Sequence, residues 1–215
     1  KPSGVAVIEV PYTKDMIAGC EFDTIYHEHL CYFSLSALVS LFRRNGLVVT
    51  DVEHIPIHGG SLRVFASRTG EDVKPAVAQM LDSELQLRMD SVEFYNKFGM
   101  AVSVLKRNLI DLLRSLKMKG SRLAAYGASA KGTTLLNYCG IGSDILDFVV
   151  DRSTAKQGMC TPGTHLEILP PSALLERMPD YTLLLTWNFA EEIMGQQKDY
   201  LSRGGHFIVP IPELR

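Results

Sequence analysis

The chain has 215 residues, of which 46% are hydrophobic and 21% charged, a composition typical of soluble globular proteins with one large or two small domains. Its net charge of -2 argues against broad binding to nucleic acid or to anionic membranes. No apolar run approaches the roughly 20 residues of a membrane span, and the scattered cysteines form no C-x-x-C pair, which indicates a reducing cytoplasm rather than a disulfide framework or a zinc site.

The first elements are a short strand and a capped helix. Residues 5–10 are rich in β-branched side chains between a glycine and a proline, which predicts a buried parallel strand. A polar loop follows. Ser34 is a good N-cap, and Phe33 and Leu38 occupy the positions of a hydrophobic staple, so a helix is expected from there to the Asn-Gly pair at 45–46.

Two further strands are expected at 47–57 and 62–66, joined by a tight turn at 58–61 into a β-hairpin. The residues after the hairpin are predicted to be helical over 71–119, with a break near 90–91. The second helix has one apolar stripe whose spacings alternate between three and four residues, and we expect this stripe to pack and to brace two domains. The stripe consists of Tyr95, Phe98, Val102, Leu105, Leu109, Leu112 and Leu116.

From residue 122 the pattern changes to strand, glycine-rich turn, helix and strand. Strands are expected at 123–126, 145–150, 181–186 and 205–209. Helices are expected after the glycine-rich turn and, without interruption, over 190–201. Alternating strands and helices imply a parallel sheet with right-handed crossovers.

The turn at 127–132 lies between a strand and a helix, where backbone N–H groups and the helix dipole attract anions. A dinucleotide fingerprint would need glycine in place of Ser129, and a phosphate loop would need lysine after Gly132 rather than before it. The turn still predicts a phosphate-binding site with Lys131 as its cation, and Asp151, after the next strand, as a partner of a ribose hydroxyl. A purely structural glycine turn is the alternative.

The segment Tyr26-His27-Glu28-His29 places four polar or ionisable side chains in a row. Histidine titrates near neutral pH, so imidazole beside a carboxylate and a phenol is suited to general acid–base catalysis. A polar surface loop is one alternative. A metal site that adds His58 is another, but no further cluster of ligands supports it, and we predict no metal.

Motifs spread over nearly the whole chain resemble the nucleotide-sugar C-methyltransferases of deoxysugar biosynthesis. They are VAVIEVPY at 5–12, EFDTIYHEHL at 21–30, HGGSLR at 58–63, YGASAKG at 126–132 and LLNY at 135–138. That family has a zinc-binding N-terminal domain, a central S-adenosylmethionine-binding domain and a C-terminal domain for the nucleotide sugar. The chain is similar to the end of the central domain and to the C-terminal domain, and it begins directly with a strand, so we expect it to be a piece of a longer protein.

The resemblance implies an α/β fold in three parts. Residues 1–70 would be the end of a class I methyltransferase Rossmann-like sheet, 71–119 a helical connector, and 120–215 a second Rossmann-like parallel-sheet domain that binds the nucleotide sugar. The implied cofactor is S-adenosylmethionine, whose main binding loop we expect upstream of this chain, so the fragment alone is expected to be inactive. The implied partner is a nucleoside-diphosphate sugar, and the oligomeric state stays open.

The implied reaction moves a methyl group from S-adenosylmethionine to C3 of a 4-keto deoxyhexose nucleotide. Loss of the C3 proton gives an enolate, which requires a base, a donor near the C4 oxygen and a fixed diphosphate. By resemblance His29 is the base, Glu28 orients or polarises the site, and Tyr26 hydrogen-bonds the sugar or its oxyanion. The expected substrate-binding residues are Gly127, Ser129, Lys131, Gly132 and Asp151. An NAD-binding oxidoreductase and a noncatalytic nucleotide-sugar-binding protein are the alternative functions.

Overall fold

The computed structural model describes residues 4–57, 59–69 and 72–215. The chain divides into two compact units, one of Lys1–Glu21 with His29–Met100 and one of Phe22–Glu28 with Ala101–Arg215. His58, considered above as a metal ligand, lies outside the described residues, as does the first residue of the predicted helical segment 71–119. Among the described residues, no helix is long and apolar enough to cross a membrane.

The first unit contains a small antiparallel sheet in the order β1-β3-β2 among the described residues. Its strands are β1 (Val5–Pro11), β2 (Val48–Ile55) and β3 (Ser61–Ser67), and the predicted hairpin of β2 and β3 is confirmed. The prediction that residues 5–10 form a buried parallel strand is wrong, because β1 runs antiparallel to β3 at an edge of the sheet. The side chains of Val5 and Val7 are 59% and 56% exposed, so an apolar composition there does not reflect burial.

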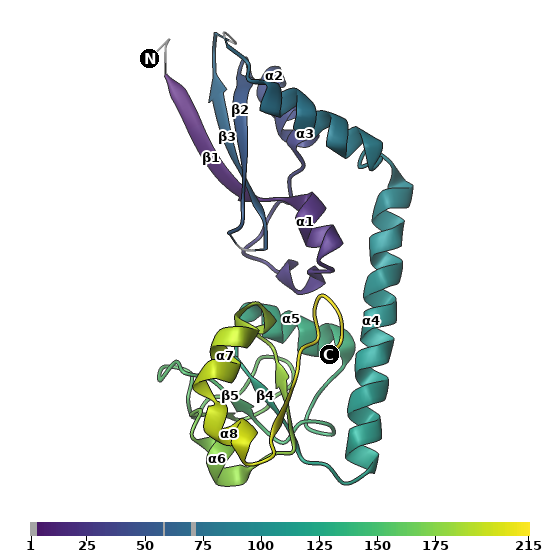
Figure 1. Ribbon diagram of the computed structural model, residues 1–215, viewed down its shortest axis with the longest axis vertical. Helices are drawn as coiled ribbons and strands as arrows, with labels where there is room; N and C mark the ends of the chain where they lie inside the picture. Colours follow the sequence, from purple (N-terminus) through teal and green to yellow (C-terminus); the bar gives the residue numbers. More distant parts are fainter. Residues whose placement is uncertain (1–3, 58, 70–71) are drawn as a thin grey trace. The chain divides into compact units, whose positions relative to one another are not determined.

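Helices α2 (Leu35–Arg44) and α3 (Pro75–Gln86) pack against β2 of this sheet (Figure 1). The predicted N-cap is confirmed, because the Ser34 hydroxyl accepts a hydrogen bond from the Ala37 N–H at 3.1 Å. The buried carboxylate of Glu84 on α3 accepts two further N–H groups at the start of α2. The expected polar loop contains α1 (Thr13–Ala18) and the 3-10 helix η1 (Phe22–Thr24), neither of which the sequence predicted.

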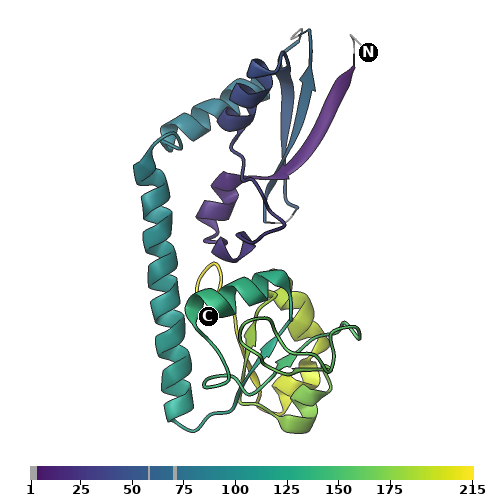
Figure 2. The same ribbon diagram turned by 180° about the vertical axis from the view of Figure 1, so that it is seen from behind.

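The predicted break in the helical segment is confirmed, since α3 ends at Gln86 and α4 (Val92–Met118) begins after it; Figure 2 shows α4 from behind. The buried residues of α4 are Val102, Leu105, Leu109, Leu113 and Leu116. The stripe therefore includes Leu113 where the sequence predicted Leu112, and Tyr95 near its start is 43% exposed. An α-helix repeats every 3.6 residues, whereas a strict alternation of three and four assumes 3.5. Over about six turns the predicted stripe therefore drifts away from the buried face.

The second unit is built on a parallel sheet in the order β6-β5-β4-β7-β8 among the described residues, which confirms the predicted α/β pattern. The strands are β4 (Leu123–Tyr126), β5 (Val149–Val150), β6 (Ile168–Leu169), β7 (Tyr181–Leu184) and β8 (His206–Ile208). The prediction of a strand over 145–150 is too long. Ile145 and Leu146 are buried in a turn that returns to the Gly142 carbonyl, so their apolar side chains imitate a strand. β6 was missed.

The helices of this unit are α5 (Ala130–Cys139), α6 (Ala173–Arg177), α7 (Ala190–Gln196) and α8 (Lys198–Ser202), with the 3-10 helix η2 (Trp187–Phe189) after β7. The predicted single helix over 190–201 is two helices, because the backbone at Gln197 leaves the helical region. The short α6 was missed. β4 and β7 lie in the middle of the sheet, and the segments that follow these two strands, together with the one after β5, carry most of the residues considered next.

Candidate active site

The glycine-rich turn after β4 has a packing reason for each of its glycines. Gly127 has a φ of 98°, in the region that favours glycine, and a Cβ there would lie 2.6 Å from the Thr186 side chain. A Cβ on Gly132 would lie 2.7 Å from the Leu185 Cβ and 3.0 Å from the Gly127 carbonyl oxygen. The two glycines therefore permit the tight turn and the close approach of α5 to the sheet, which are two of the roles of glycine in nucleotide-binding turns.

The turn uses most of its own backbone donors. The N–H groups of Gly127 and Ser129 donate to carbonyl oxygens, and the Gly132 N–H donates to the Ser129 hydroxyl at 3.0 Å. Ser129 is thus the N-cap of α5, where a dinucleotide fingerprint would have glycine. The N–H groups of Ala130 and Lys131 donate to no described residue. A phosphate at this helix end would therefore meet these two donors.

Asp151 follows β5 and is held against the turn. One carboxylate oxygen accepts the Ala128 N–H and the other accepts the Ser153 N–H, each at 2.7 Å. The Lys156 ammonium lies 3.9 Å away and donates to the Ala128 carbonyl at 2.7 Å. The Asp151 carboxylate therefore connects the turn to the loop after β5. A ribose hydroxyl would have to donate to carboxylate oxygens that already accept backbone N–H groups.

A cavity of about 660 Å³ opens beside this turn, within the second unit. Tyr26 and His27 form part of its wall, and their ring centroids lie 6.1 Å apart with an interplanar angle of 64°. The remaining lining residues come from the turn, from α5 and from the segment before β6: Ala128, Ser129, Ala130, Thr133, Thr134, Asn137, Lys156, Met159, Cys160, Pro162 and Ile168. The structure therefore brings part of the predicted catalytic segment to the predicted substrate-binding turn.

The predicted catalytic residues are distributed over the two units. Tyr26 and Glu28 belong to the second unit, whereas His29 belongs to the first, where its ring lies 6.3 Å from the ring of Tyr32. Burial raises the pKa of the Tyr26 phenol, and the negative charges of Glu28 and Asp23 raise it further. Tyr26 therefore stays protonated at neutral pH and can donate a hydrogen bond.

Lys131 faces a partner that the sequence did not reveal. Its ammonium lies 5.1 Å from the centre of the Trp187 ring, and the Trp187 N–H donates to the buried carboxylate of Asp23 at 2.7 Å. Lys131 is half-buried. Asp23 and Trp187 are 164 positions apart, and only the motif around Asp23 could have drawn attention to it.

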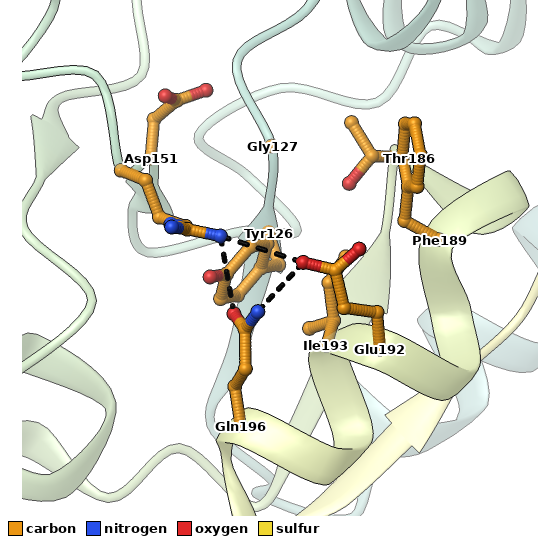
Figure 3. Close-up of a pocket in the computed structure, with 9 residues that line it drawn as sticks. Tyr126, Gly127, Asp151, Thr186, Phe189, Glu192, Ile193 and Gln196 are labelled. Atoms are coloured by element: carbon orange, nitrogen blue, oxygen red, sulfur yellow. Dashed lines mark hydrogen bonds and ion pairs between the residues drawn. The ribbon is translucent and has the colours of Figure 1, made fainter.

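A second cavity, of about 270 Å³, lies at the carboxyl ends of β4, β5 and β7 (Figure 3). Gly127 and Asp151 line it, together with Phe189 and residues of α7. Arg152 reaches the Glu192 carboxylate and the Gln196 amide oxygen at 3.5 Å each, and the Gln196 amide donates to Glu192 at 2.7 Å. The point where the strand order reverses is the usual ligand site of open α/β sheets. Of the predicted substrate-binding residues, Gly127 and Asp151 line this cavity and Ser129 lines the larger one, whereas neither lining includes Lys131 or Gly132.

No group of three or more histidine, cysteine or acidic side chains suited to a metal ion occurs among the residues that the structure describes. Cys31, Cys139 and Cys160 are free thiols. Cys160 lines the larger cavity and is exposed, whereas Cys139 on α5 is buried.

Comparison with known proteins identifies the family of this chain, whose structure combines a parallel sheet, a glycine-rich turn and a polar segment. The profile described as the C-methyltransferase C-terminal domain matches residues 56–212, so the chain belongs to that family. The chain is also 41% identical, over its whole length, to the C-methyltransferase NovU of Streptomyces niveus. It spans 51% of the length of that relative.

Proposed function

We propose that the complete protein is an S-adenosylmethionine-dependent C-methyltransferase that acts at C3 of a 4-keto deoxyhexose carried on a nucleoside diphosphate. The observation that carries this proposal is the shared wall of the larger cavity, where Tyr26 and His27 meet the turn before α5. A proton donor, an imidazole and a phosphate-binding turn are the groups that enolate formation on a nucleotide sugar requires. Family membership supports the methyl-transfer part of the proposal.

The chain's own residues would remove a proton and stabilise an oxyanion. In this proposal His29 takes the C3 proton, and Glu28 orients the base or polarises the site. Tyr26 donates to the C4 oxygen, where negative charge develops, because its raised pKa keeps the phenol protonated. His27 is the second candidate for the base, since its side chain lines the cavity.

The turn before α5 would hold the diphosphate. The N–H groups of Ala130 and Lys131 and the Lys131 ammonium would bind its oxygens, at the end of α5 that carries positive partial charge. Gly127, Ser129 and Gly132 shape this turn through the packing and capping described above, and Asp151 would contact the ribose. Residues 120–215 would thus be the nucleotide-sugar domain and 71–119 the helical connector.

We assign S-adenosylmethionine binding to the domain that contains residues 1–70 and not to residues 120–215. Residues 1–70 would supply the last strands of a class I methyltransferase sheet, with β1 at the edge of the described part of the sheet. The first unit has only antiparallel pairings among its described strands and no strand, glycine turn and helix in parallel arrangement, so the residues present do not form a cradle for S-adenosylmethionine. The bound cofactor would supply the electrophilic methyl group.

The test uses the complete protein with S-adenosylmethionine and a nucleoside-diphosphate 4-keto deoxyhexose. A product heavier by one methylene unit, with the new methyl at C3 by NMR, is the expected result. In D₂O without the methyl donor, the protein should also exchange deuterium into C3 faster than buffer does. Methyl transfer to an oxygen of the sugar, or exchange at the buffer rate, would contradict the proposal.

A further inference from the structure

Asp23 is an ionisable side chain in the interior of the second unit. It lies on η1 and is fully buried. One oxygen accepts the Trp187 N–H at 2.7 Å, and the other oxygen is buried without a hydrogen-bond partner in the described structure. A buried carboxylate is costly unless nearby groups compensate its charge, so the surroundings of Asp23 require an explanation.

Lys131 supplies the compensating charge. Burial raises the pKa of Asp23 above its usual value, and the Trp187 hydrogen bond, the positive charge of Lys131 and the nearby backbone N–H groups of Asp23 and Thr24 offset part of that rise. The Trp187 ring contacts both groups, because its N–H edge bonds the carboxylate while its face lies 5.1 Å from the ammonium. Asp23, Lys131 and Trp187, here called the Asp23 cluster, therefore connect η1, α5 and η2.

The Asp23 cluster adjoins both halves of the candidate site. Tyr26 follows Asp23 by three positions, and the charge of Asp23 acts on its phenol together with that of Glu28. Lys131 lies on α5, next to Ala130 and in the turn whose free donors face the expected diphosphate. One buried carboxylate thus acts on the proposed oxyanion donor and on the proposed phosphate-binding cation.

We propose that Asp23 is a positioning residue, which fixes the Tyr26 segment against α5 and holds the Lys131 ammonium over the Trp187 ring. The roles of Tyr26 and Lys131 in this inference rest on the proposed function. Asp23 itself lines neither cavity. Its effect on the reaction would be indirect, through the charge and position of the Tyr26 and Lys131 side chains.

The first test is Asp23→Asn in the complete protein. Asparagine keeps the size of the side chain and an oxygen that can accept the Trp187 N–H, but it removes the negative charge. Since that charge disfavours the phenolate, its loss lowers the pKa of Tyr26, while Glu28 keeps its own contribution. Tyrosinate absorbance, taken as the difference from Tyr26→Phe in the same background, should then appear at lower pH than in the parent, and the alkaline limb of methyl transfer should move the same way.

The second test follows the carboxylate itself through Trp187. The emission of Trp187, isolated as the difference between the parent and Trp187→Phe, should change as Asp23 takes up a proton on acidification. Lys131 is the charged group beside both Asp23 and Trp187. The acid transition should disappear in Asp23→Asn, measured against Asp23→Asn with Trp187→Phe.

Phe22→Leu is the matched control. The Phe22 ring lies 5.1 Å from the Tyr138 ring and anchors the same turn to α5 without any charge. This variant should lower thermal stability but leave both titrations where they are. If Asp23→Asn leaves the Tyr26 titration unmoved, or if Phe22→Leu moves it equally, the charge of Asp23 does not act on Tyr26 and the inference is overturned. If both titrations respond as expected but the protein transfers no methyl group, the proposed function fails and the electrostatic link between Asp23 and Tyr26 stands.

Discussion

Replacing Gly132 with alanine should show how closely α5 must approach the sheet. The new Cβ would lie 2.7 Å from the Leu185 Cβ, an atom fixed close to its backbone, and 3.0 Å from the Gly127 carbonyl oxygen. Overpacking of a close-packed site costs about 1–3 kcal/mol, because side chains and backbone must shift to relieve it. Alanine also gains about 1 kcal/mol over glycine in a helix, so the measured loss of stability should be smaller than the steric cost.

Gly195→Ala supplies the reference for this comparison. Gly195 lies in α7, and a Cβ there would meet no atom within 4 Å. Alanine at 195 should therefore stabilise the protein by roughly the helix-propensity gain of about 1 kcal/mol. The difference between the two variants in the free energy of unfolding then isolates the steric cost at Gly132, expected at about 1–3 kcal/mol.

Urea denaturation of the parent and the two variants, followed by circular dichroism, measures these free energies if the slopes agree. Binding of a nucleoside diphosphate to Gly132→Ala provides a second readout, since displacement of α5 moves the N–H groups of Ala130 and Lys131. Equal stabilisation by both substitutions would show that α5 does not approach Leu185 as described, and it would refute the packing account of the turn.

Four further outcomes are expected. In the complete protein, His29→Ala should lower methyl transfer by roughly 100- to 10,000-fold and spare nucleotide-sugar binding; a change of only a few-fold, with a large loss in His27→Ala, would make His27 the base. Lys131→Ala should weaken nucleoside-diphosphate binding by about 10- to 150-fold, less at high salt, and equal affinities at two salt concentrations would remove Lys131 from the site. The same variant should also lower stability, since it leaves the buried Asp23 charge less compensated, and an unchanged melting temperature would count against that pairing. The 215-residue chain alone should not bind S-adenosylmethionine tightly, and a micromolar dissociation constant by calorimetry would contradict this.

Local sequence signals predicted the elements whose causes are local. The Ser34 cap, the hairpin of β2 and β3, and the strand, turn and helix around Gly127 each depend on residues that are neighbours in the sequence. The orientation of β1 was predicted wrongly because its direction depends on pairing with β3, about 55 residues later, and not on its own composition. The very short β5 and β6 are defined by hydrogen bonds to neighbouring strands, so their ends cannot be predicted from a pattern in the sequence.

The candidate site shows the same limit. The motif around Tyr26 identified a chemically suited segment, and the turn before α5 was placed correctly between a strand and a helix. That Tyr26 and His27 line a cavity with this turn depends on contacts across about 100 residues, which periodicity cannot reveal. The Asp23 hydrogen bond to Trp187 is a pairing of the same kind.

The assignment of Phe22–Glu28 to the unit of residues 101–215 has a consequence for engineering hybrids within this family. A chimera joined within α4 at the division near residue 100 would take its C-terminal half from one parent and η1 from the other. The carboxylate of residue 23 would then have to match a tryptophan and a lysine with which it did not evolve. Exchanging the seven-residue segment Phe22–Glu28 together with the C-terminal half keeps the Asp23 cluster intact. The part to be exchanged between parents is therefore discontinuous in sequence.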